Sequence, residues 1–170
     1  ADEMEADWKR VRVEQAQGDA IYGNQNTDGS WSVRGFMQRM REAGATARLM
    51  LEQAAAQEWN VDVAECQAQL HKVIHRPSGR SLDFADLVAI ASSLPVPGLE
   101  MLTLKSPEQF RYIGKPLPIV DLDDMTHGRA QYGADIRIPG MKFAAIARPP
   151  VVFGRVKSYD AERTLAQPGV

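Results

Sequence analysis

The chain has 170 residues, of which 44% are hydrophobic and 25% are charged; this ordinary globular balance excludes a largely disordered chain. Twenty Lys and Arg residues against 22 Asp and Glu residues give a net charge of −2, which excludes the strongly basic surface of a nucleic-acid-binding protein. The one cysteine, Cys66, excludes an internal disulfide framework and a cysteine-ligated iron–sulfur cluster. No run approaches the ~20 apolar residues of a transmembrane segment.

In the first part of the chain, one long helix is the clearest prediction. Val11 and Val13 alternate with charged residues and predict a short strand. After a polar loop, apolar residues recur at helical spacing and predict a helix over residues 33–58, with Ser32 as its N-cap. Gly44 lies inside this helix at a cost of ~1 kcal/mol relative to alanine, so we expect another backbone to approach it closely.

The region after this helix predicts a hairpin and a second helix. Residues 70–76 and 80–82 are two strands joined by a Pro-Ser-Gly turn. Asp83 then caps a helix over residues 84–93, which a following Pro-Val-Pro sequence stops. The residues expected on the inward face of this helix are Phe84, Leu87, Val88 and Ala91.

A proline-rich stretch divides the chain into two structural units. Residues 95–118 predict an extended linker. Residues 1–100 carry 10 basic and 15 acidic groups (−5), whereas residues 101–170 carry 10 and 7 (+3). The elements expected in the second unit are strands over 141–147 and 151–156 and a short helix over 159–166.

No self-contained catalytic site is evident in the sequence. Nucleophile-elbow, P-loop and dinucleotide-binding motifs are absent. Cys66, His71 and His75 have a C-x4-H-x3-H spacing, but a structural zinc site needs a fourth ligand, which only a nearby carboxylate could supply; a hairpin with surface histidines is therefore favoured. The aspartates within 121–124 lack EF-hand spacing and indicate a solvated acidic loop.

The segment 23–32 is the strongest local indication of binding. A polar, glycine-bearing loop leads there into the predicted helix, whose free N–H groups and partial positive charge suit an oxyanion. Gly29 permits a close approach of the backbone, and Ser30 and Ser32 add hydroxyl donors. The alternatives are an ordinary capped helix and a small-anion binder; we expect Arg34 and its neighbours to form a solvated face.

Two groups of motifs resemble one known family. The first comprises GNQNTDGSWSV at 23–33 and AAAQEW at 54–59. The second comprises GRAQYGADIRIPGM at 128–141, ARPP at 147–150 and PGV at 168–170. In this order they resemble the large-subunit family of molybdenum hydroxylases, in the branch of the isoquinoline 1-oxidoreductase β-subunit and the membrane-associated aldehyde dehydrogenases.

This resemblance implies an α+β fragment. Residues 1–94 are expected to be a segment of the molybdenum-cofactor-binding domain, with a long helix plus a hairpin, residues 95–118 a linker, and residues 119–170 a partial α/β-hammerhead domain. The implied cofactor is molybdopterin cytosine dinucleotide, held by the parent enzyme and absent from this chain alone. The resemblance assigns no catalytic residue and no metal ligand here. The cofactor-binding candidates are Gln25, Gly29, Ser30 and Ser32.

The function implied for the parent enzyme is oxidation of aldehydes or N-heterocycles with water as the source of oxygen. Its implied partners are the remainder of the large subunit, an iron–sulfur small subunit or cytochrome c that accepts electrons, and a small-molecule substrate. The resemblance suggests a periplasmic or membrane-associated location. Since Ala1 is not an initiator methionine and the chain stops just after a Pro-Gly turn signal, we expect an excised piece or a processed subunit of a larger protein. The resemblance implies that the family's catalytic glutamate and its other pterin-binding loops lie beyond this chain, so the chain is expected to be inactive alone.

Two departures from the family pattern lie in the loop. Asp28 stands where relatives commonly have glycine, and its carboxylate would repel a phosphate. Trp31 stands where many relatives have arginine. Both favour an alternative, a non-catalytic assembly module that keeps the fold without the cofactor.

Overall fold

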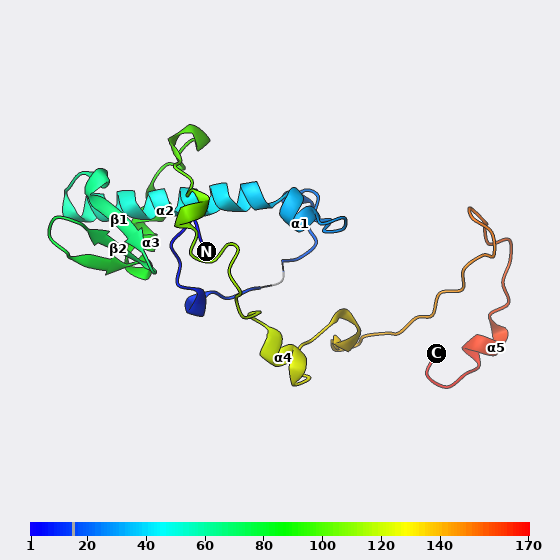
Figure 1. Cartoon of the computed structure of the whole chain (residues 1–170). Helices are drawn as coiled ribbons and strands as arrows, with labels where there is room; N and C mark the ends of the chain where they lie inside the picture. The colour runs from blue at the N-terminus through cyan, green and yellow to red at the C-terminus, as the bar shows by residue number, and fades with distance from the viewer. Residues whose placement is uncertain (15) are drawn as a thin grey trace. The chain divides into compact units, whose positions relative to one another are not determined.

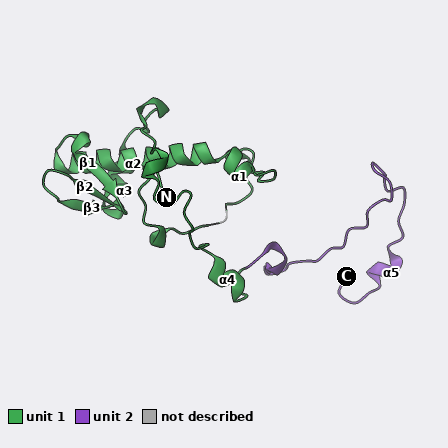
Figure 2. Cartoon of the chain, viewed as in Figure 1, with its two compact units in different colours: residues 1–130 green, residues 131–170 purple. Residues whose placement is uncertain are grey.

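In the computed structural model, which describes residues 1–14 and 16–170, the core lies where a long helix meets a small antiparallel sheet and a second helix (Figure 1). The chain divides into two compact units, residues 1–130 and residues 131–170 (Figure 2). The stretch predicted as a linker, residues 95–118, belongs to the first unit. None of the helices in the described residues is long and apolar enough to cross a membrane.

The single helix predicted over residues 33–58 is in fact two helices. α1 (Trp31–Arg34) is one turn, and α2 (Met37–Trp59) follows after a two-residue junction that begins with Gly35. The Trp31 indole lies across this junction and occupies the space that a Cβ at Gly35 would need. The junction therefore requires glycine, and helical periodicity alone did not reveal it.

Gly44 lies where the N-terminal segment crosses α2. A Cβ at Gly44 would lie 3.1 Å from the Cβ of Glu3 and 3.5 Å from the backbone nitrogen of Met4. The predicted close approach of another backbone is therefore confirmed. The lower helix propensity of glycine is offset here by the packing that the missing side chain allows.

Three short strands form the sheet in the order β1–β2–β3, all antiparallel. β2 (Lys72–His75) and β3 (Ser81–Asp83) are the two predicted strands; β2 is shorter than the predicted range and β3 is displaced by one residue. β1 (Cys66–Gln69) was missed by sequence reasoning, although its residues alternate between buried and exposed. A two-residue turn joins β1 to β2, and both of its residues have positive φ, 46° at Leu70 and 70° at His71.

α3 (Phe84–Ser93) closes the core over the sheet and α2. Its predicted cap is confirmed: the Asp83 carboxylate accepts the Ala85 N–H, and Asp86 completes a capping box. Leu87 is fully buried as predicted, but Val88 is 58% exposed, so its inward placement was wrong. The buried residues of the core are Leu51, Ala54, Ala55, Ala56, Cys66, Ala68, Val73, Phe84, Leu87 and Ala91.

The stretch 95–118 is irregular in structure but is not an extended surface linker. It contains single 3₁₀ turns at Leu99–Met101 (η4) and Pro107–Gln109 (η5). Between them Lys105 is buried, and its ammonium lies 3.1 Å from the Asp2 carboxylate. The prediction failed because a paired internal charge leaves no periodic signal in a proline-rich sequence.

The strands predicted outside this sheet are not formed. Residues 11–13 are irregular after a 3₁₀ turn at Trp8–Arg10 (η1), and residues 141–147 and 151–156 contain no strand. A strand is stable only when its backbone N–H and C=O groups pair with a neighbour. Within the described part of the chain, these segments lie in no ladder.

Few regular elements occur towards the C-terminus. α4 (Leu122–Thr126) is the last helix of the first unit. The second unit contains one 3₁₀ turn, Gly133–Asp135 (η6), and the one-turn α5 (Glu162–Leu165). α5 is shorter than the helix predicted over residues 159–166. Phe153 in the second unit is 96% exposed. The assignment of residues 119–170 to a partial hammerhead domain stays a prediction.

Candidate cofactor-binding loop and the adjoining groove

The loop before α1 is held by hydrogen bonds between its own polar groups. The Asn24 side-chain oxygen accepts the Asn26 N–H at 2.9 Å, and the Asn26 amide donates to the Asp28 carboxylate at 2.8 Å. Two consecutive left-handed residues, Gly29 (φ 54°) and Ser30 (φ 60°), then turn the chain into α1. Both residues of this turn are exposed, and glycine adopts the left-handed conformation without the strain that a side chain would bring.

All four predicted cofactor-binding residues are exposed on this loop or on α1. Gln25 donates to the backbone oxygen of Gln17 at 3.3 Å. Ser32 is not the N-cap that the sequence predicted: Ser30 holds that position, and its side chain makes no capping bond. Since α1 has only four residues, the dipole of a long helix does not begin at this loop. The role of the four residues stays a prediction.

Arg34 supplies positive charge to the loop. Its guanidinium carbon lies 5.2 Å from the centroid of the Trp31 ring, which is cation–π geometry. A Cβ at Gly29 would lie 3.6 Å from one of its nitrogens. Within residues 1–14 and 16–170, Arg34 forms no ion pair with a carboxylate, so its charge is available to a ligand. Sequence reasoning treated Arg34 as part of a solvated face, although the three-residue spacing from Trp31 on one helical turn could have indicated the contact.

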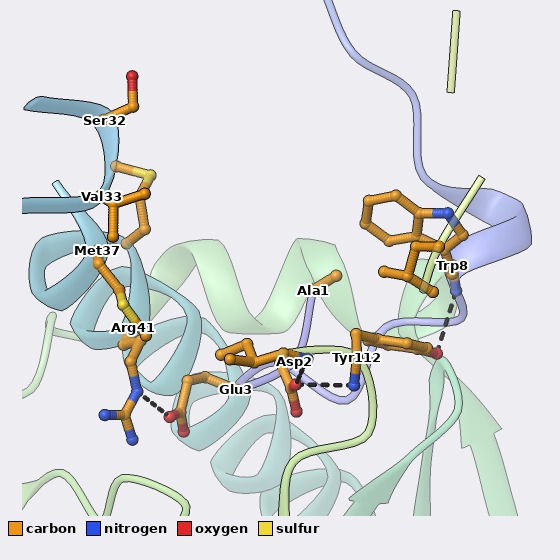
Figure 3. Close-up of a pocket in the computed structure, with 12 residues that line it drawn as sticks. Ala1, Asp2, Glu3, Trp8, Ser32, Val33, Met37, Arg41 and Tyr112 are labelled. Atoms are coloured by element: carbon orange, nitrogen blue, oxygen red, sulfur yellow. Dashed lines mark hydrogen bonds and ion pairs between the residues drawn. The ribbon is translucent and has the colours of Figure 1, made fainter. Parts of the chain in front are cut away.

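An apolar groove of about 530 Å³ adjoins the loop at Ser32 (Figure 3). One wall is formed by side chains of α1 and α2, and the other by the N-terminal segment and the end of the stretch 95–118. On the second wall the ring centroids of Trp8 and Tyr112 lie 5.9 Å apart. The Tyr112 hydroxyl also accepts the backbone N–H of Trp8 at 3.2 Å. The two walls of the apolar groove comprise Val33, Met37 and Met40 on one side and Trp8, Tyr112, Ile113 and Leu117 on the other.

The floor of the apolar groove is charged, but its charges are satisfied internally. Asp2 is 6% exposed; its carboxylate accepts three backbone N–H groups, those of residues 111–113, at 2.9 to 3.2 Å, and the Lys105 ammonium. Burial raises the pKa of the Asp2 carboxyl, but these donors outweigh it and lower the pKa to about 2. The Asp2 carboxylate is therefore ionised at neutral pH and fully engaged.

Glu3, beside Asp2, is engaged in the same way. Its carboxylate accepts the Arg41 guanidinium at 2.7 Å and the Lys105 backbone N–H at 3.0 Å, and Arg48 lies 3.9 Å away. Among the described residues, no buried side-chain polar atom lacks a hydrogen-bond partner. This network joins the N-terminal segment, α2 and the stretch 95–118, and its role is structural.

The two histidines of the predicted hairpin and Cys66 before it have separate partners, and the prediction of surface histidines was wrong for His75, which is buried. His71 Nδ1 accepts the Asp7 N–H at 2.9 Å, whereas His75 lies between the Ser78 hydroxyl at 2.7 Å and the Glu65 carboxylate at 3.1 Å. Cys66 is buried, and this burial raises the pKa of its thiol. The described residues contain no group of three or more His, Cys, Asp or Glu side chains that could hold a metal ion.

Two carboxylates of the acidic stretch 121–124 are likewise paired with a nearby arginine. The Arg129 guanidinium contacts the carboxylates of Asp123 and Asp124, the latter at 2.8 Å. Two neighbouring surfaces of the described chain are therefore considered further. The first is the polar, exposed loop with the Arg34 guanidinium beside it, which suits hydrogen bonding to an oxyanion, and the second is the adjoining apolar groove.

Comparison with known proteins gives this arrangement a context. The chain is 32% identical over its whole length to the β-subunit of isoquinoline 1-oxidoreductase from Brevundimonas diminuta, and covers 27% of that protein. It is 32% identical over 94% of its length to the membrane-bound aldehyde dehydrogenase [pyrroloquinoline-quinone] of Gluconacetobacter polyoxogenes, of which it covers 21%. One of the subunits of nicotinate dehydrogenase from Pseudomonas putida is 32% identical over 65% of the chain. No family model matches the chain.

These matches confirm the resemblance predicted from the loop and the GRAQYGADIRIPGM motif. The chain is related to the large-subunit family of molybdenum enzymes, of which these three proteins are members. The two relatives that match over at least 94% of the chain are the isoquinoline 1-oxidoreductase β-subunit and the membrane-bound aldehyde dehydrogenase, the two proteins that the resemblance had named. It spans about a quarter of the length of these two relatives.

Proposed function

We propose that this chain is the part of a molybdenum-containing oxidoreductase that contributes a cofactor-binding loop, and that the whole enzyme oxidises aldehydes or N-heterocycles. The observation that carries the proposal is its 32% identity to an isoquinoline oxidoreductase subunit and to an aldehyde dehydrogenase, over at least 94% of the chain in both cases. The chain alone is expected to be inactive, since the proposal places the catalytic residues and the other cofactor contacts of the whole enzyme outside it.

The proposed cofactor is molybdopterin cytosine dinucleotide, and the donor set of the loop fits it. The amide of Gln25 and the hydroxyls of Ser30 and Ser32 are exposed donors, and Gly29 lets a ligand approach the backbone. Arg34 beside Gly29 adds a positive charge that complements phosphate oxygens. In this proposal the five residues bind and orient the dinucleotide end of the cofactor.

When bound, the cofactor supplies the redox centre of the reaction. Conversion of an aldehyde to an acid adds the oxygen of one water and releases two protons and two electrons. In the proposed enzyme the electrons pass to the iron–sulfur centres or the cytochrome of a partner subunit. The five residues of the loop and α1 only position the cofactor. Their neutral donors and the always-charged Arg34 are unsuited to moving a proton at neutral pH.

The second candidate function is a non-catalytic assembly module, and Asp28 is the observation that favours it. Its carboxylate is exposed in the loop and would repel a phosphate. The Arg34 guanidinium opposes this argument, because it lies over Trp31, the position where many relatives carry arginine. The loop therefore keeps a positive charge, and we favour the enzyme.

The enzyme proposal is tested by the origin of the oxygen in the product. The complete native protein is incubated with an aldehyde or an N-heterocycle and an artificial electron acceptor in ¹⁸O-labelled water. Mass spectrometry should find the label in a carboxylic acid, after correction for aldehyde hydrate exchange, or in a hydroxylated heterocycle. Protein purified with all its subunits that turns over neither substrate class, or an N-heterocyclic product whose oxygen comes from O₂, contradicts the proposal.

A further inference from the structure

The apolar groove lies on the half of α2 that the chain leaves uncovered. The C-terminal half of this helix packs alanines and Leu51 against the sheet and α3. The N-terminal half, together with α1 before it, carries exposed apolar side chains: Met40 on α2 is 64% exposed and Val33 on α1 is 65% exposed. These apolar side chains therefore stand where the described chain provides no cover, and a contiguous exposed patch of this kind marks an interface.

The composition of the groove defines the chemistry of its occupant. The walls are aliphatic and aromatic, and Met37 and Met40 are adaptable packing partners. The two carboxylates of the floor, those of Asp2 and Glu3, are already paired with their own donors. Because the walls are apolar and the carboxylates are paired, an incoming cation would find no free carboxylate, and the occupant that fits is apolar. A volume of about 530 Å³ accommodates several side chains of a packed segment.

We propose that the apolar groove is an internal interface of the large subunit, filled by apolar side chains from polypeptide outside residues 1–170. The lengths of the relatives favour this occupant over a second copy or another protein: the chain covers 27% and 21% of the two matched over nearly all of it, so most of such a subunit lies elsewhere in the same polypeptide. The inference rests on the proposed function only for the existence of that larger subunit.

This interface links assembly of the subunit to the cofactor-binding loop. Ser32 lines the rim of the groove and is also one of the predicted cofactor contacts. A segment seated between the Val33 and Trp8 walls fixes α1 against the rest of the unit, and α1 carries the end of the loop. The cofactor site therefore reaches its final geometry when the remainder of the subunit docks.

The test is cysteine accessibility in the complete native polypeptide. Met40→Cys and Val33→Cys place thiols in the groove, and Val88→Cys is the matched control, since Val88 is 58% exposed on α3, away from the groove. The native Cys66 is buried. With a maleimide under native conditions, both groove thiols should react at least tenfold more slowly than the control, and all three should react alike after unfolding.

Each other outcome overturns the inference. Groove thiols that react as fast as the control show an uncovered face. Groove thiols already protected in the 170-residue chain show cover by this chain or by a second copy. A natural polypeptide no longer than this chain also overturns it. Molybdenum is measured on the same preparations, so failure of the interface is distinguishable from failure of the proposed enzyme.

Discussion

Replacement of Asp2 by asparagine tests the buried network that holds the first unit together. The carboxylate accepts three backbone N–H groups and the Lys105 ammonium, and its pKa falls from the ordinary value near 3.8 to about 2. That shift corresponds to about 2 kcal/mol in favour of the ionised, folded form. Asparagine removes the charge and one acceptor oxygen, so Asp2→Asn should destabilise the chain by about 2 to 4 kcal/mol at pH 7.

The pH dependence follows from the sign of the shift. A pKa lower in the folded than in the unfolded chain stabilises the fold above about pH 4, and this contribution is lost as the pH falls towards 2. Urea unfolding followed by circular dichroism at pH 7 and near pH 2.5 should therefore show a difference between wild type and Asp2→Asn that shrinks in acid. Asp19→Asn is the control, since Asp19 is exposed and caps one N–H that asparagine also caps.

The refuting results are specific. A destabilisation by Asp2→Asn of less than about 0.5 kcal/mol at pH 7 equals that of an ordinary surface substitution and removes the network from the account. A difference between the two proteins that persists unchanged at pH 2.5 shows that the lost term is not the ionised carboxylate.

Three further changes test the core, a close approach and the loop. Leu87→Ala should cost ~2–5 kcal/mol in urea unfolding, whereas Val88→Ala on the same helix should cost less than ~0.5 kcal/mol; equal effects would contradict the described core. Gly44→Leu should lower stability by about 1–3 kcal/mol by forcing the N-terminal segment off α2, and a stabilised variant would refute that packing. Gly29→Val in the complete enzyme should lower the molybdenum content at unchanged subunit assembly, whereas Gly114→Val, an equally left-handed turn away from the loop, should not; retention of full molybdenum by Gly29→Val would remove the loop from the cofactor site.

The sequence predicted those elements whose determinants are local. The cap at Asp83 and the hairpin around the Pro-Ser-Gly turn are determined by neighbouring residues, and both are present. The close approach at Gly44 was predicted correctly because a glycine inside a helix lowers its stability, and close packing of another backbone is the usual reason for one there. β1 was missed because four small and polar residues carry little strand propensity, and its pairing with β2 depends on the turn at Leu70 and His71.

What the sequence could not predict depends on distant partners. Lys105 and Asp2 are 103 positions apart, and the residues next to them in the sequence do not indicate that either charge is buried. The junction at Gly35 arises because the indole of Trp31 folds across it, which periodicity does not encode. At the loop, the sequence identified the residues and the family but wrongly made Ser32 the cap of one long helix, because α1 and α2 share one apolar pattern.

The central claim is that this chain forms part of a molybdenum enzyme. The most direct test is elemental and mass analysis of the complete protein purified with its subunits from its native source, with the released cofactor identified. The account predicts stoichiometric molybdenum together with a cytidine-containing pterin. Intact protein without molybdenum, or with pyrroloquinoline quinone as its organic cofactor, would contradict it.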